Sequence, residues 1–329
     1  MNGRAVKKGT HHHYVPQFLL RGFATAKRKL VYVFDKSNDN EFRSPVRHVA
    51  CQLDFYNPDV DRWLTELEDT SAPIIQSIRT KRTLTHLRKD EIHWLASSIA
   101  VQRVRTLHHR ALFADLNKQM ADAIREMGTE PNTVKNFREF TESENRELAN
   151  SEVARVSFKL LPNILNKAWI LCSAPSGNEF WIGDHPVTLD NNMNPGDELH
   201  SNLGFAVQGI EIYLPISSQL TLGCLCPSIR AMFAHSHAGL LPPVPRAFDF
   251  VKAFEGSTTL ELDAENVKRQ NSLQVIYAER FVYSEHGAFG MVREMIARNE
   301  NVRRGLRTEL VGRSRRKRTA QNEKPHPEG

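Results

Sequence analysis

The first residues with the chemistry of a site lie near the start of the chain, where three histidines, His11 to His13, precede Tyr14. Imidazole titrates near pH 7, so it can bind a metal or transfer a proton. Adjacent side chains of a strand point to opposite faces, so His12 and His13 can share one metal only in a loop. Two interpretations stay open: these histidines act as base or metal ligand, or they are structural residues at the edge of a core.

A second group of polar residues interrupts the apolar stripe of an expected long helix. Arg103 lies within the stripe, and Gln102 and Arg105 flank it. A guanidinium near a core is tolerated only if it pairs with a carboxylate or binds an anion. Its planar fork suits carboxylate or phosphate. The alternatives are a structural network, with Glu68 or Asp184 as partner, and a site for an anionic ligand.

A third candidate is the sequence Asp184-His185-Pro186, which follows an expected short strand. An acid at the end of a strand, followed by a proline that forces a turn, is a common way to present a carboxylate in a cleft. The same residues would also form a turn in which Asp184 caps its own backbone. The sequence does not decide between the two.

Other chemical patterns carry less weight. His12 or His13 followed by Asn40 and His48 has the order of an HNH nuclease, but no helix signal joins the last two. The four cysteines are too isolated for a zinc site, and we expect buried free thiols in a reducing compartment. The chain has none of the common phosphate-binding, serine-hydrolase or metalloprotease motifs.

Several of these segments resemble, in order, the motifs of a large bacterial family of unknown function whose members open with an HHYVPQFLLRxF-like stretch. The matching segments are His11–Phe23, Asp54–Tyr56, Glu68, the QxxRT-like Gln102–Thr106, the SDxPV-like Gly183–Val187 with Gly183 in place of Ser, Asn271, and Ala278–Arg280. The first motif is specific, and the resemblance covers roughly residues 11–284. It implies no activity, but it adds Arg21 and Asn271 to the candidate ligand-binding residues.

The elements that would position these residues follow from periodicity and turn signals. Strands are expected at 28–35, 46–56, 168–172, 180–183, 211–215, 219–226 and 281–283, and helices over 89–127, 142–166 and 262–275, with further helical spacing from Trp63 to Ile78. Asp263 is placed to cap the last of these helices. The order predicts an α+β fold, with small sheets at the N-terminus and in the second half around a helical bundle with one long helix.

Charge and composition predict the division of the chain. Residues 301–329 hold nine Lys or Arg and three Glu, so the net charge of +6 belongs to this segment and the rest is neutral. We expect a flexible leader over 1–10, a single domain over 11–300 and a disordered basic tail over 301–329. The tail could contact nucleic acid. No apolar run reaches the roughly 20 residues of a membrane span, and the start has no secretory signal, so we expect a cytoplasmic protein.

These observations lead to competing hypotheses of function. The first is a hydrolase acting on a phosphate-containing substrate, such as a metal-dependent nuclease, with a divalent metal as candidate cofactor. His12, His13 and Asp184 would then be catalytic, and Gln102 and Arg105 would hold the anion. The second is a non-catalytic binding or sensor module for an anionic ligand or partner. The third assigns every motif a structural role.

Overall fold

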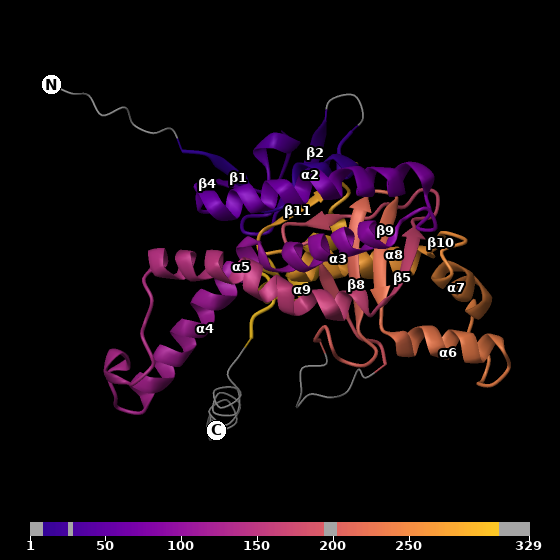
Figure 1. Cartoon of the computed structure of the whole chain (residues 1–329). Coiled ribbons are helices and arrows are strands. Elements are labelled where there is room, and N and C mark those ends of the chain that lie inside the picture. Colours follow the sequence, from indigo (N-terminus) through magenta and orange to yellow (C-terminus); the bar gives the residue numbers. More distant parts are fainter. Residues whose placement is uncertain (1–8, 26–28, 194–202, 309–329) are drawn as a thin grey trace, which may run out of the picture.

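Strands from both halves of the chain form three sheets in the computed structural model, which describes residues 9–25, 29–193 and 203–308 (Figure 1). The first sheet pairs β1 (His11–His13) with β4 (Cys51–Leu53); the second has the order β3 (Asn40–Pro45), β2 (Leu30–Asp35), β11 (Phe281–Ser284), β6 (Ile182–Gly183); the third has the order β10 (Leu260–Glu261), β5 (Ala168–Ser173), β9 (Leu220–Leu225), β8 (Glu211–Ser217), β7 (Thr188–Asp190). Only β10 and β5 pair in parallel among these strands. The α+β class predicted from the sequence is confirmed.

The helices of the described residues fall into two groups along the chain. The first group is α1 (Gln17–Leu20), α2 (Pro58–Lys81), α3 (Lys89–Val104), α4 (Leu107–Glu126) and α5 (Glu142–Leu165), and the second is α6 (Pro227–His237), α7 (Ala247–Phe254), α8 (Ala264–Tyr277) and α9 (Gly290–Arg298). Short 3₁₀ turns cover Arg21–Phe23, Val46–His48, Pro131–Thr133 and Glu300–Arg303. None of the described helices is long and apolar enough to cross a membrane.

Local capping explains where several helices begin. The side chain of Asn57 accepts a hydrogen bond from the Val60 amide at the start of α2. Thr141 and Glu144 form a reciprocal capping box at the start of α5. Asp263 accepts from the amide of Asn266 at 2.8 Å, so it caps α8 as the sequence predicts.

The prediction of a single long helix over residues 89–127 is wrong. The helix ends with α3 at Val104, and a separate helix, α4, begins at Leu107. Thr106 has extended backbone angles, and its hydroxyl accepts from the His109 amide at 3.4 Å to start α4. The helical periodicity continues across the break, which is why the apolar pattern alone did not reveal it. A short polar residue that can cap a new helix competes with continuation of the old one.

The N-terminal strands also differ from the expectation. The predicted strand 46–56 is a 3₁₀ turn over Val46–His48 followed by the short β4. The partner of β2 is instead β3, which begins at Asn40 and is mostly exposed. It lacks the alternating apolar face that marks a strand in sequence, because its first four residues are all exposed and both faces of this edge strand meet solvent there.

One large core joins the helices and sheets, and a smaller cluster with Phe34, Trp181 and Phe289 lies beneath α9. The segment after α9 also packs on the body. Lys36, fully buried, donates to the carbonyl of Val302 at 2.7 Å, and Arg307 forms an ion pair with Glu279. Residues 301–308 are therefore part of the body rather than of a tail. The rest of the expected tail, 309–329, and the expected leader up to residue 8 lie outside the described residues.

Candidate functional site

Arg105 lies at the break between α3 and α4 and is 4% exposed. Its guanidinium donates to Glu68 Oε1 and to the carbonyl of His13, each at 2.6 Å. Burial alone would lower the pKa of Arg105, but neighbouring Tyr56 and Glu68 raise it above its ordinary value. These bonds favour the structural network with Glu68 over an anion site.

The other polar residues around the break also bond to groups of the protein, although the buried Gln102 Oε1 has no hydrogen-bond partner among the described residues. Gln102 Nε2 donates to the carbonyl of Tyr14 at 2.9 Å. Arg103 Nη1 lies 2.6 Å from His185 Nε2 and donates to the carbonyl of Val187 at 2.9 Å. A cavity of about 20 Å³ lies beside Gln102 and Arg105. That volume is close to one water molecule and leaves no room for a phosphate-containing substrate.

The two candidate catalytic histidines have different surroundings. His12 accepts from the Tyr56 amide through Nδ1 at 2.9 Å, and its Nε2 lies 3.8 Å from Asp61. His13 Nε2 is buried and has no hydrogen-bond partner among the described residues. Burial lowers the pKa of His13, so the imidazole is neutral at pH 7. His12 and His13 lie on β1, so their side chains point to opposite faces of that strand.

Asp184 is fully buried, and its carboxylate anchors the start of β11. It accepts the amides of Glu279 at 2.6 Å, Arg280 at 2.9 Å and Phe281 at 2.9 Å. Burial raises the pKa of Asp184 to about 6, even though these hydrogen bonds act to lower it. The neighbouring His185 lies 2.6 Å, through Nδ1, from the Thr106 hydroxyl. The segment therefore meets the helix break through bonds that hold backbone and side chains in place.

The two residues added by the family resemblance have different surroundings. Arg21 is exposed on a 3₁₀ turn. Asn271, on α8, accepts from the Trp181 amide and donates to the carbonyl of Glu179. It therefore fixes the segment before β6. The roles expected for these residues stay predictions.

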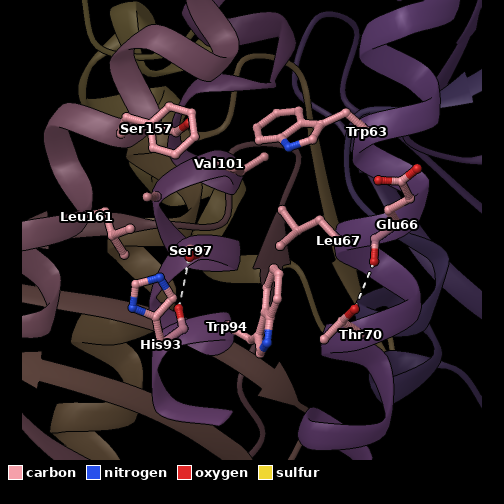
Figure 2. Close-up of a pocket in the computed structure, with 12 residues that line it drawn as sticks. Trp63, Glu66, Leu67, Thr70, His93, Trp94, Ser97, Val101, Ser157 and Leu161 are labelled. Carbon is pink, nitrogen blue, oxygen red and sulfur yellow. Dashed lines mark hydrogen bonds between the residues drawn. The ribbon is translucent and has the colours of Figure 1, made fainter. Parts of the chain in front are cut away.

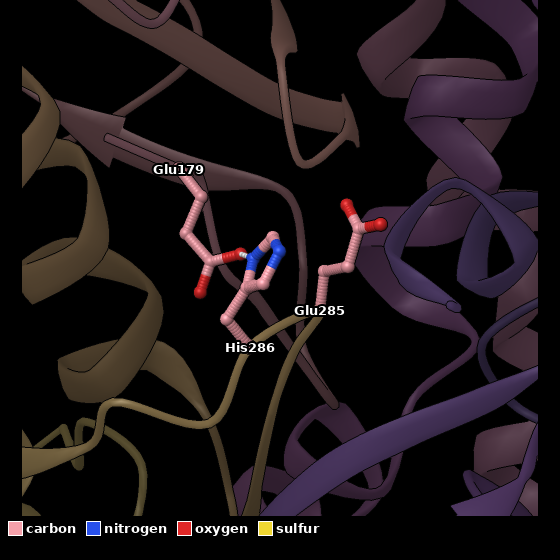
Figure 3. A group of neighbouring side chains, drawn as sticks. All are labelled: Glu179, Glu285 and His286. Atoms are coloured by element: carbon pink, nitrogen blue, oxygen red, sulfur yellow. Dashed lines mark hydrogen bonds and ion pairs between the residues drawn. The ribbon is translucent and has the colours of Figure 1, made fainter. Parts of the chain in front are cut away.

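A candidate metal-binding group lies elsewhere, where Glu179, Glu285 and His286 bring three ligand atoms within 4.8 Å of one another. Figure 3 shows the imidazole beside the carboxylate of Glu179, and His286 Nδ1 lies 2.8 Å from Glu179 Oε2. Glu285 accepts from the Ser218 hydroxyl. The hydrogen bond that His286 donates to Glu179 raises the pKa of His286, as in an ordinary ion pair. The group includes none of the metal ligands predicted from the sequence.

Two larger pockets could admit a molecule. The first, the helix groove, has a volume of about 480 Å³ and lies between α2, α3 and α5. Figure 2 shows the indoles of Trp63 and Trp94 facing it, together with Leu67. The dashed lines in the figure join hydroxyls to main-chain groups of their own helices, such as Ser97 to the His93 carbonyl. Its walls are mainly apolar, and these hydroxyls are already bonded.

The second, the sheet pocket, has a volume of about 620 Å³ and lies on the five-stranded sheet beneath α6, α7 and α8. Its lining includes Ile170, Cys172, Asn192, Glu211, Tyr213, Leu225, Ile229, Met232, Phe233, Arg246, Phe250, Asp263, Asn266 and Gln270. Gly223 of β9 allows Ile170, which lines the pocket, to pack closely against the sheet, since a Cβ at position 223 would lie 2.9 Å from Ile170. Apolar walls with a few polar groups are typical of small-molecule sites.

Glu211 and Gln270 are two polar residues of the sheet pocket that could bind a ligand and that were not identified from the sequence. Burial raises the pKa of Glu211, while hydrogen bonds from Tyr213 and Asn192 act to lower it. Gln270 is 6% exposed, and its Oε1 has no hydrogen-bond partner among the described residues. The one available sequence signal was an acid at the start of the otherwise apolar strand 211–215.

Comparison with known proteins gives the family but no activity. A family described as a protein of unknown function (DUF4238) matches residues 11–287. Searches of curated proteins and of solved structures gave no match. The matched range contains both pockets and every candidate residue of the sequence.

Proposed function

The chain belongs to the DUF4238 family, and we propose that it binds a small organic molecule in the sheet pocket. This is the binding or sensor class of the hypotheses drawn from the sequence. The proposal assigns recognition to Glu211 and Gln270, not to the histidines and arginines of the N-terminal motif. It assigns no reaction to the pocket.

The observation that carries the proposal is the free acceptor of Gln270. A buried polar atom with no partner costs about 1–3 kcal/mol of desolvation free energy. Gln270 Oε1 is such an atom, and its side chain lines the pocket. The oxygen is buried as the amide is oriented in the structure, so the amide must turn toward the pocket before a ligand N–H or O–H donor can bond it and recover this cost. The helix groove offers no comparable group in its described lining.

The size and the walls of the sheet pocket also support the binding of a small molecule. Sites for small molecules enclose roughly 300–1,000 Å³ and combine apolar walls with a few placed polar groups. The sheet pocket, at about 620 Å³, falls in this range. The rings of Phe233 and Phe250, stacked 3.9 Å apart, form an aromatic part of the wall.

The hydrolase hypothesis has less support from the contacts of its residues. Asp184 accepts three backbone amides, and Arg105 binds Glu68 and a main-chain carbonyl. A catalytic acid or base must reach a substrate atom within hydrogen-bond distance. Neither of the two large pockets is lined by His12, His13 or Asp184.

A direct test screens small aromatic amines, amides, alcohols and carboxylates for an increase in the thermal midpoint. Ligand at about 100 times its Kd stabilises a protein by about 2.7 kcal/mol, which is a shift of several degrees. The variant Met232→Trp would fill the sheet pocket from α6. Met120→Trp, at a 41% exposed position of α4, is the matched control.

The expected result is at least one compound that stabilises the wild type and Met120→Trp but not Met232→Trp. Crosspeak shifts of the Gln270 side-chain amide in NMR spectra would place the compound. Equal stabilisation of both tryptophan variants, or no compound that stabilises the wild type, would overturn the proposal.

A further inference from the structure

We infer that the ligand of the sheet pocket is an organic cation with N–H donors, held between Glu211 and Gln270. The inference rests on the proposed binding function and adds the chemical class of the ligand. It differs from the anionic ligand expected from the arginines of the sequence. Three features of the pocket lead to it: its donors, its acceptors and its charge.

Three donor groups of the pocket, those of Tyr213, Asn192 and Arg246, already have acceptors in the protein. The hydroxyl of Tyr213 donates to Glu211 Oε2, and Asn192 Nδ2 donates to Glu211 Oε1 at 2.9 Å. Arg246 donates to Asp249 at 3.0 Å and to the carbonyl of Glu261 at 2.8 Å. An anionic ligand could accept from the single O–H of Tyr213 only by breaking its bond to Glu211.

The amide of Asn192 is itself held in one orientation. The guanidinium of Arg269 donates to Asn192 Oδ1 and to Asp190. The nitrogen of the Asn192 amide is thereby turned toward Glu211. This arrangement gives the carboxylate two fixed donors, one from β8 and one from the loop after β7, and holds it in place for a ligand.

The acceptors of the pocket remain available. A carboxylate has about four lone-pair positions, and the two hydrogen bonds to Glu211 use only one on each oxygen. Gln270 Oε1 also has no partner among the described residues, and it becomes accessible to a ligand donor when the buried amide turns toward the pocket. Glu211 comes from β8 and Gln270 from α8, so a ligand donor group between them would bridge sheet and helix.

The charge of the lining favours a cation. It contains the carboxylates of Glu211 and Asp263 and the guanidinium of Arg246, which is paired with Asp249 outside the lining. Phe233, Phe250 and Tyr213 add aromatic rings, whose faces attract cations. A cation would therefore meet both a partly buried counter-ion and aromatic walls.

Proton linkage gives the inference a second readout. Burial raises the pKa of Glu211, so protons compete with a bound cation at acidic pH. The charged or titratable groups that act on Glu211 are Tyr213, Asp190, Arg269 and Cys172. A bound cation stabilises the ionised carboxylate, so affinity should fall as pH decreases through the pKa of Glu211.

The test uses three probes of nearly equal shape: 2-phenylethylamine, phenylacetamide and phenylacetate. Calorimetric titration of the full chain at pH 8 should give the lowest Kd for the amine, about tenfold below that of the carboxylate. At pH 4.5 the amine is still charged, and its affinity should fall severalfold. Glu211→Gln should bring the Kd values of amine and amide within about twofold of each other.

The outcomes separate this inference from the proposed function. Phenylacetate binding as tightly as the amine, with both lost in Met232→Trp, would overturn the cation and leave the binding pocket in place. Binding of any probe that survives Met232→Trp would overturn the pocket itself. If Glu211→Gln does not fold, the pH dependence of the wild type still decides, because an unchanged amine affinity between pH 8 and 4.5 contradicts the role of Glu211.

Discussion

Arg105 Nη2 donates to the carbonyl oxygen of His13 at 2.6 Å, which joins the break between α3 and α4 to the N-terminal strand β1. Thr106, the next residue, bonds His185 of the second-half motif. Two motifs that are far apart in the sequence therefore meet at the two residues of one helix break. Their contact has a structural role, since the groups that connect them are main-chain atoms and buried side chains.

Arg105→Ala should lower the free energy of unfolding by about 3 kcal/mol, because removal of one member of a buried ion pair leaves the other uncompensated. Glu68 would lose its cation, and the His13 carbonyl would lose its donor. Urea denaturation measures the change. Arg88→Ala is the control, since the ion pair of Arg88 with Asp90 is mostly exposed. A loss below about 0.5 kcal/mol, typical of surface positions, would contradict the structural role.

Asp184→Ala should destabilise the protein more than Asp184→Asn. Alanine leaves three partly buried amides, those of residues 279–281, without an acceptor, and an unpaired buried group costs about 1–3 kcal/mol. Asparagine keeps one oxygen as an acceptor. Thermal and urea unfolding of both variants give the order. Asp59→Ala, at an exposed position of α2, controls for loss of a carboxylate. Equal stability of Asp184→Ala and wild type would show that the anchor is unimportant.

Much of the fold was predictable because local sequence patterns, such as helix caps and apolar runs, indicate its elements. The cap at Asp263 marks α8, and the apolar run from Ala168 predicts β5. The helix break was not predictable, because the pattern of apolar residues does not show that the Thr106 hydroxyl caps a new helix. The short helices α6 and α7 went unnoticed, since they are defined mainly by what they pack against.

The candidate site was less predictable than the fold. His12, Arg105 and Asp184 stand out because ionisable residues near apolar segments are unusual, but burial within a structural network produces the same pattern. Glu211 and Gln270 look ordinary in the sequence. Their importance arises from tertiary structure, which brings a strand and a helix around one cavity and leaves an acceptor without a partner.

A chain that ends at residue 300 should have a thermal midpoint several degrees below that of a chain that ends at residue 308. The shorter chain lacks the Val302 carbonyl that accepts from buried Lys36, and it lacks the ion pairs of Arg303 with Asp39 and of Arg307 with Glu279. Differential scanning calorimetry of the two chains measures this difference. Identical midpoints for both truncations would show that residues 301–308 contribute nothing.

Acid should remove a contribution of Glu279 to stability. Burial alone would raise the pKa of Glu279, but hydrogen bonds from His108 and Arg307 hold it at about 2. The folded pKa thus lies below the unfolded value, so the stabilisation is full above about pH 4.5 and is lost as pH falls toward 2. The difference between wild type and Glu279→Gln, on the order of 2 kcal/mol at pH 6, should shrink by pH 3. Glu261→Gln, an exposed control, should show no such trend. A pH-independent difference would contradict the linkage.

Gln270→Leu should affect stability and binding in opposite directions. Leucine is similar in size to glutamine and removes a buried acceptor that has no partner among the described residues, so the ligand-free protein should gain up to about 1 kcal/mol in unfolding free energy. The same change removes a hydrogen bond to the ligand, so the Kd for 2-phenylethylamine should rise about tenfold.

The control for this last variant is Gln76→Leu, at an exposed position of α2, which should change neither quantity by a comparable amount. Urea unfolding without ligand and calorimetric titration with the amine give the two readouts from one preparation. If Gln270 had only a structural role, its substitution would lower the free energy of unfolding and leave the Kd for the amine unchanged. We expect higher stability together with weaker binding only if the acceptor is kept unpaired for a ligand. Functional groups that are positioned for binding lower the stability of the ligand-free protein. Destabilisation of the ligand-free variant together with unchanged affinity would therefore reject the role assigned to Gln270.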